Sequence, residues 1–268
     1  MSLTLTFSLF LSSCTENEDS LDEVTSSELT SVESSARSSA TPWDFDSSYS
    51  TNDDFQVDND GNGAHNWDED DYTDDPNDNG FDVRDYIFVN DGRLVLVCPR
   101  GSDGDRRRAE YRDQTNIDLD RRNRMNLTFD IRNYNNRSEL IMAQLHNDDS
   151  RASRPYVTVV AEDGGIRLQR TNAPTGSSTT TASERIPFRQ NDRYRIRMDS
   201  PNNSRRIDVR INNLDTGKEA RENFSFDSDW NALDGSFYWK HGAYMPDGGS
   251  TGTRQRVEAI SFATNRRN

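Results

Sequence analysis

From Tyr86 onward the chain consists of short runs rich in β-branched and aromatic residues, separated by turn residues. Good turn formers lie between the runs, at Asn90-Asp91-Gly92, Asp163-Gly164-Gly165 and Asp215-Thr216-Gly217. No segment keeps a helical hydrophobic period over three turns. Many short strands with regular turns favour an all-β fold, a jelly-roll β-sandwich of two antiparallel sheets. The expected strands are Tyr86–Val89, Arg93–Val97, Asn126–Arg132, Leu140–His146, Tyr156–Val160, Ile166–Arg170, Tyr194–Met198, Ile207–Ile211, Phe237–Tyr244 and Val257–Phe262.

Alternation within two of these regions supports the strand prediction. Residues 193–198 alternate arginine with an apolar residue, which puts three arginines on one face. This arginine row has two interpretations, the lining of a groove for an acidic polymer or an ordinary solvated face. The run Phe237–Tyr244 also divides by parity. We expect Phe237, Trp239 and Ala243 in the core and, on the opposite side, Tyr238, Lys240 and Tyr244.

Three stretches far apart in the chain place polar and charged residues at strand spacing: Arg108–Arg112, Gln144–His146 and Lys240–Tyr244. Residues two apart in a strand share a face, so each stretch presents its polar side chains together. Gly242 has no side chain, and we expect it to leave an open slot in the third stretch. Brought together, these groups provide carboxylate binders, a candidate base and a candidate acid. Such a set suits chemistry on an acidic sugar.

In this order the three stretches resemble the signature of the alginate lyases of polysaccharide lyase family 7, which reads R-[ST]-E-L-R, then Q-[IV]-H, then Y-F-K-A-G-x-Y-x-Q. The resemblance covers the chain from about Trp43 to its end. Three neighbours of the polar positions differ, namely Ala109, Tyr111 and Leu145. The third block runs from Tyr238 to Pro246 and lacks the final Gln of the family.

The resemblance implies a jelly roll with a concave substrate groove and cleavage of a polyuronate by β-elimination. In that reaction a base removes the C5 proton, an acid assists the leaving C4 oxygen, and the adjoining carboxylate must be neutralised. Arg108 and Gln144, with His146, are the candidates for neutralising the carboxylate. Tyr244 is the candidate acid and, for one stereochemistry, also the base, while His146 is the alternative base.

Three further residues are expected to bind substrate and support these groups. Lys240 and Arg112 are expected to lower the pKa of Tyr244 from its ordinary value near ~10. Glu110 is expected to orient Arg108 or Arg112. Taken singly, each of these residue types has an ordinary structural interpretation, on the surface or, for the histidine, in the core. As an ordered set they favour a site.

The formal charge of −15 argues against nucleic acid and anionic membrane as partners. A polyanionic substrate therefore requires positive charge concentrated at the site. Lys218 and Lys240 are the sole lysines among 32 cationic residues, and the rest are arginine. A lysine thus occupies the motif position for which the family resemblance implies a compact ammonium.

The N-terminal residues 1–14 are a short apolar run that ends in Leu11-Ser12-Ser13-Cys14, and they resemble a bacterial lipoprotein signal. Residues 15–42 are rich in Ser, Thr and Glu, which predicts a disordered tether. Residues 43–268 are expected to form the lyase-like domain, with an acidic loop segment at 53–85. The signal predicts an exported protein that is lipid-anchored through Cys14 at the bacterial outer membrane or cell surface.

The acidic segment also contains a calcium-loop pattern of the EF-hand type. Asp58, Asp60, Asn62 and Glu69 would supply oxygen ligands, and Gly63 the sharp turn. No amphipathic helix flanks the pattern, and Asp-rich sequence matches it often. A structural calcium is therefore one interpretation, and the chemistry of the site requires no cofactor.

Three functions remain open from the sequence. The leading hypothesis is an exported, monomeric polysaccharide lyase acting on alginate or a related polyuronate such as glucuronan. The second is a non-catalytic carbohydrate-binding jelly roll that holds the polymer at the cell surface. The third is a structural surface protein. Incubation with polyuronates, followed by ultraviolet absorbance, discriminates them because only a lyase creates the conjugated double bond.

Overall fold

Short strands make up most of the structure, a computed structural model that describes residues 40–59, 63–78, 80–99, 106–117, 119–134, 139–246 and 255–266. The described residues all lie in one compact unit, which spans 37–268. In chain order the elements are η1 (Pro42–Phe45), β1 (Asp54–Asp58), β2 (His65–Trp67), α2 (Glu69–Asp74), β3 (Asn77–Asp78), β4 (Phe81–Asp82), η2 (Val83–Asp85), β5 (Ile87–Asn90), β6 (Arg93–Cys98), β7 (Arg107–Arg112), β8 (Asn123–Arg132), β9 (Leu140–Asn147), β10 (Val157–Glu162), β11 (Gly165–Thr171), β12 (Thr179–Pro187), β13 (Arg193–Ser200), β14 (Arg206–Asn213), β15 (Glu219–Ser225), α3 (Ser228–Asn231), β16 (Phe237–Met245) and β17 (Gln255–Arg266).

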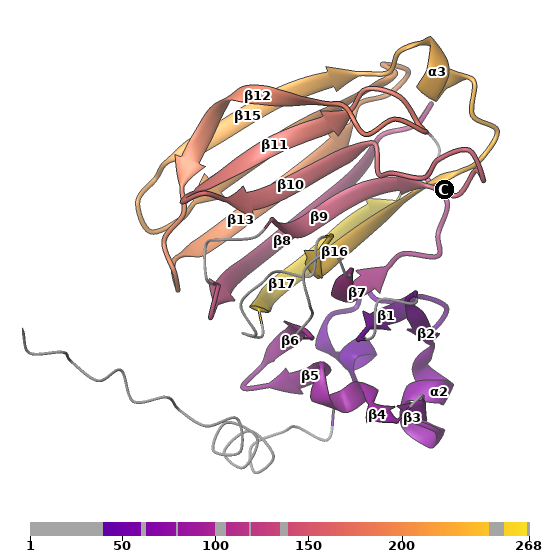
Figure 1. Cartoon of the computed structure of the whole chain (residues 1–268), viewed down its shortest axis with the longest axis vertical. Coiled ribbons are helices and arrows are strands. Elements are labelled where there is room, and N and C mark those ends of the chain that lie inside the picture. The colour runs from indigo at the N-terminus through magenta and orange to yellow at the C-terminus, as the bar shows by residue number, and fades with distance from the viewer. Residues whose placement is uncertain are drawn as a thin grey trace, which may run out of the picture. The chain divides into compact units, whose positions relative to one another are not determined.

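Two antiparallel sheets form the layers of a β-sandwich (Figure 1). Within the described residues, the larger sheet has eight strands in the order β12-β11-β10-β9-β16-β7-β1-β2. The second sheet has seven, in the order β15-β14-β13-β8-β17-β6-β5. The inner faces of both sheets bury one apolar cluster, whose members include Trp239, Tyr111, Phe129 and Phe262. The predicted jelly roll is confirmed.

Every strand expected from the sequence is present, with ends that differ by a few residues. The parity prediction for β16 is also confirmed, because Phe237, Trp239 and Ala243 belong to the core cluster. Cys98 is fully buried in the same cluster, and burial raises the pKa of its thiol. None of the helices in the described ranges is long and apolar enough to cross a membrane.

The acidic segment 53–85 is not the loop that its composition predicts. It contributes β1 and β2 to the larger sheet, where β1 pairs with β7. Phe55 and Val57 alternate along β1 and are fully buried, which offsets the poor strand propensity of the Asp and Asn residues around them. Tertiary pairing therefore overrides local composition here.

The arginine row of residues 193–198 does not line the groove described below. It lies on β13, in the seven-stranded sheet, while the groove lies on the eight-stranded one. The apolar partners Tyr194, Ile196 and Met198 are fully buried, so the arginines point away from the core. The row therefore does not line that groove, since periodicity gives a face and not the sheet to which it belongs.

Candidate active site

Three adjacent strands at the centre of the eight-stranded sheet unite the three polar stretches. β16 pairs with β7 on one side and with β9 on the other. Lys240 lies opposite Arg112 on β7 and opposite Gln144 on β9. Tyr244 lies opposite Arg108. Stretches that lie far apart in sequence thus become neighbours at strand spacing.

Glu110 contacts three other residues of this arrangement. Its carboxylate accepts a hydrogen bond from Lys240 Nζ at 2.7 Å and another from Gln144 Nε2. Arg108 Nη1 lies 3.6 Å from the same carboxylate. Glu110 and Lys240 are 1% and 3% exposed, so their charges interact with little screening from water. Glu110 therefore contacts Arg108, which it was expected to orient, and it also bonds to Lys240 and Gln144.

Gly242 provides a close approach between strands, not the open slot expected from the sequence. Its φ of 148° is one that L residues rarely adopt. A Cβ atom at this position would lie 2.3 Å from the carbonyl oxygen of Ala109 and 2.7 Å from Cα of Glu110. The backbone of β7 occupies the space that a side chain at Gly242 would need. This close approach brings Glu110 next to Lys240.

We predict that Gly242→Ala destabilises the fold and displaces Glu110, because the clash is with main-chain atoms. The expected loss in the free energy of unfolding is about 1–3 kcal/mol or more, together with a fall in turnover. Gly217→Ala is a matched control, since Gly217 has a φ of 71° with no atom within 4 Å of the added Cβ. Urea unfolding of both variants checks the prediction. Equal losses would contradict it.

Tyr244 lies on the same strand face as Lys240, and Arg108 covers it. The guanidinium carbon of Arg108 is 4.4 Å from the centre of the Tyr244 ring. Burial raises the pKa of Tyr244, although the charge of Arg108 acts in the opposite direction. The expected lowering by Lys240 and Arg112 was wrong, because desolvation of the phenolate outweighs the nearby cations. At neutral pH the Tyr244 hydroxyl is protonated, as an acid requires.

His146 is a neutral imidazole at pH 7. Burial, reinforced by the charge of Lys240, lowers its pKa to about 4. Nδ1 lies 2.9 Å from the backbone nitrogen of Asn147 and 2.8 Å from its carbonyl oxygen, which holds the ring in place. The ring also stacks on Tyr238 at a centroid distance of 5.4 Å. A neutral imidazole at pH 7 has the protonation state that a base needs.

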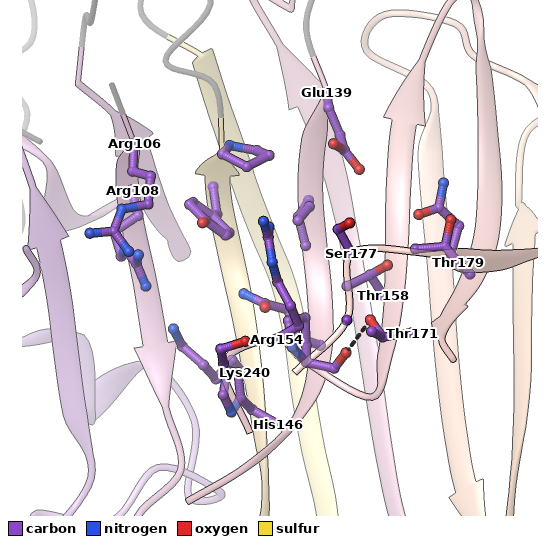
Figure 2. Close-up of a pocket in the computed structure, with 18 of the residues that line it drawn as sticks. Arg106, Arg108, Glu139, His146, Arg154, Thr158, Thr171, Ser177, Thr179 and Lys240 are labelled. Carbon is purple, nitrogen blue, oxygen red and sulfur yellow. Dashed lines mark hydrogen bonds between the residues drawn. The ribbon is translucent and has the colours of Figure 1, made fainter. Parts of the chain in front are cut away.

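These groups line one groove of about 810 Å³ on the outer face of the larger sheet. In Figure 2, Arg106 and Arg108 lie on one side of this pocket and Thr158 and Thr179 on the other, with Lys240 between them. The residues that the motifs predicted at the groove are Arg108, Gln144, His146, Lys240 and Tyr244. Its charged lining residues are Arg106, Arg108, Arg154, Arg167 and Lys240, against Glu139. Positive charge is therefore concentrated here although the chain is strongly acidic.

The comparisons with known proteins agree with this geometry. The family model described as alginate lyase matches residues 61–264, which is more than half of the chain. The chain belongs to the alginate lyase family. It is accordingly a polysaccharide lyase that acts on alginate, with the jelly-roll fold of that family. A comparison with curated proteins finds no relative by sequence.

Solved structures of alginate lyases share the fold at low sequence identity. The product complex of a Tyr-to-Phe variant of the family 7 alginate lyase A1-II' is 16% identical, with a TM-score of 0.61, covering 85% of this chain and 99% of that one. The alginate lyase from Klebsiella pneumoniae is 10% identical, with a TM-score of 0.62 and coverages of 84% and 98%. The marine PL7 alginate lyase from Zobellia galactanivorans is 16% identical, with a TM-score of 0.58 and coverages of 84% and 99%.

Some residues of this alginate lyase family member lie where the motifs did not point. Arg154 comes from the β9–β10 connection and extends into the pocket (Figure 2), where no periodic signal marks it. Thr158, Arg167 and Gln169 alternate with apolar residues on β10 and β11, so strand parity was the signal that could have found them. Arg112 does not line the groove, and its guanidinium lies 4.8 Å from the ring centre of Tyr238.

The calcium-loop pattern spans the β1–β2 hairpin. Asp58 ends β1, is fully buried and lies 4.0 Å from Arg108 Nε, while Glu69 begins α2. Asp60 and Asn62 lie outside the described residues. Across the part of the chain that is described, no three acidic, His or Cys side chains are placed to hold a metal. Calcium binding stays a prediction.

Proposed function

We propose that this lyase cleaves alginate or a related polyuronate by β-elimination, with Arg108 and Gln144 neutralising the carboxylate of the sugar that is cut. Arg108 offers a planar guanidinium that can donate two parallel hydrogen bonds to a carboxylate. Gln144 gives one amide N–H to Glu110, which leaves the second to donate to the substrate. Neutralising this carboxylate stabilises the enolate-like intermediate that forms when C5 loses its proton.

Tyr244 and His146 are the proposed proton-transfer groups. The base takes the C5 proton, the C5 electron pair forms the C4–C5 double bond, and the C4–O bond breaks. The leaving oxygen then receives the proton of the Tyr244 hydroxyl. His146 is the base for one stereochemistry. For the other, Tyr244 acts as both base and acid: its phenolate takes the C5 proton and then gives that same proton to the leaving oxygen. Structures of A1-II' variants that carry Tyr-to-Phe, or His-to-Asn with Tyr-to-Phe, hold product or substrate, which supports these roles.

The observation that carries the proposal is the convergence of Arg108, Gln144, His146, Lys240 and Tyr244 on one cationic groove. The test is incubation with alginate, polymannuronate, polyguluronate and glucuronan, followed by ultraviolet absorbance of the unsaturated product. Growth of absorbance with at least one polymer is the expected result. Retention of a polymer without any absorbance change would instead support the carbohydrate-binding jelly roll.

We also propose that the lyase is exported and held at the bacterial surface by a lipid on Cys14. The support is the apolar run that ends in Leu11-Ser12-Ser13-Cys14, followed by the Ser, Thr and Glu-rich residues 15–42. Residues 1–39 lie outside the described residues, so the tether stays a prediction over most of its length. Mass spectrometry of protein purified from its host should show a chain that begins at a lipidated Cys14. An unmodified chain that retains Met1 would contradict the anchor.

A further inference from the structure

The side of the sandwich opposite the groove carries an unusual excess of arginine. We define the outer arginine face as the outward positions of β13, β14 and β15, which alternate with buried apolar residues. Its arginines are Arg193, Arg195, Arg197, Arg206, Arg210 and Arg221. The carboxylates at outward positions of the same strands are Asp199, Asp208 and Glu219. Six cations against three anions is the reverse of the balance in a chain of charge −15.

The carboxylates of this face are more recessed than the arginines that pair with them. The side chain of Asp199 is 7% exposed and accepts bonds from Arg197, Arg122 and Arg124, which are 39%, 50% and 24% exposed. Arg210 is 49% exposed and its partner Glu219 is 27% exposed. Acids that are less exposed than the guanidiniums around them give the solvent a positive surface.

Arginines also lie side by side across the strands of this face. Arg197 is directly opposite Arg210, and Arg210 is directly opposite Arg221. Neighbouring strands are ~4.8 Å apart, and like charges directly opposite each other are destabilising. Arg221 and Arg195 form no ion pair with any carboxylate in the described ranges. Asp199 and Glu219 offset part of this repulsion at Arg197 and Arg210, and an anion bound at the face would offset the rest.

We propose that the outer arginine face is a second, non-catalytic binding site for a polyuronate chain. Guanidinium groups grip carboxylates bidentately, and a polyuronate presents a carboxylate on each sugar. The outward positions of the three strands carry no aromatic residue, so recognition rests on charge and hydrogen bonds rather than stacking. The choice of polymer rests on the function proposed above. A site on the far side of the sandwich holds the lyase on its substrate while the groove engages and releases chains.

The test uses the full chain with Arg195→Gln/Arg221→Gln, a double variant that breaks no ion pair of the described structure. We measure retention on immobilised alginate with a saturating uronate trisaccharide in the groove, and separately turnover of a short soluble oligosaccharide. The expected result is a loss of retention of about tenfold with unchanged turnover of the oligosaccharide. The loss should shrink as salt rises, because screening removes the contribution of exposed charges. Arg84→Gln is a control that removes a partly exposed arginine, paired with Asp82, from η2, and it should retain the polymer as the wild type does.

Retention equal to that of the wild type in the double variant would overturn the proposal. Equal losses in the double variant and in Arg84→Gln would also overturn it, because general charge would then explain binding. If the double variant loses retention on DNA or on a sulfated polymer but not on alginate, the face serves another polyanion and the proposal is wrong. The two proposals can be refuted independently. A wild type that forms no unsaturated product refutes the lyase proposal. Retention on the polymer tests the outer arginine face without any turnover.

Discussion

Tyr244→Phe is expected to lower turnover by about 10²–10⁴-fold while leaving substrate affinity and fold nearly intact. The substitution removes one hydroxyl, and the aromatic ring that packs under the Arg108 guanidinium remains. The carboxylate grip therefore survives while proton transfer to the leaving oxygen is lost. Steady-state rates on the best polyuronate, followed by ultraviolet absorbance, measure kcat and KM separately.

Two further variants serve as comparisons for Tyr244→Phe. Tyr238→Phe removes the hydroxyl of another half-buried tyrosine on the same strand and should leave turnover close to that of the wild type. Arg108→Ala should raise KM and lower kcat together, since its charge meets the substrate carboxylate before and during enolate formation. Near-native turnover of Tyr244→Phe would show that Tyr244 is not the acid, and His146 would become the leading candidate.

Glu110→Ala is expected to have the second large effect, on stability as well as on turnover. Burial lowers the pKa of Lys240 to about 8, and the charge of Glu110 opposes that shift. Removing the carboxylate leaves a buried ammonium and the guanidinium of Arg108 without this partner. The expected cost is about 3–5 kcal/mol in the free energy of unfolding. Urea unfolding at neutral pH measures it.

A double variant tests whether the loss of stability comes from the unpaired charge of Lys240. In Glu110→Gln/Lys240→Met both charges are absent, so much of the lost stability should return, because no uncompensated ammonium is buried. Turnover should stay low, since Arg108 and Gln144 are no longer fixed by the carboxylate. If the free energy of unfolding of Glu110→Ala lies within about 1 kcal/mol of the wild-type value, the contacts of Glu110 do not stabilise the fold.

Much of the core could be predicted from sequence because alternation survives wherever one strand face is buried. In the missed strands that signal is short or weak. β12 buries little beyond Ala182 and Ile186, since it lies at the edge of the larger sheet. β15 is likewise an edge strand with few buried residues. β1 carries Phe55 and Val57 among acidic neighbours, and pairing with β7 decides its structure.

The residues of the site could be predicted from the sequence, but their pKa shifts and the spacing of the strands that carry them could not. Short ordered motifs identified Arg108, Gln144 and Tyr244, and strand parity placed them on one face. The direction of the Tyr244 pKa depends on how burial compares with the charge of Arg108, which sequence does not give. The role of Gly242 likewise depends on how closely β7 approaches β16.

The position of Glu110 has a consequence for how the chain acquires activity. Its carboxylate joins β7 to β9 and β16, with partners 34 and 130 residues away along the chain. Contacts between distant residues form slowly, because the loop between them must be closed before the contact is gained. The complete set of Glu110 contacts therefore requires strands from both halves of the described chain to be in place. A chain whose synthesis has not yet reached β16 lacks Lys240 and Tyr244, and so has no complete site with which to cleave its polymer.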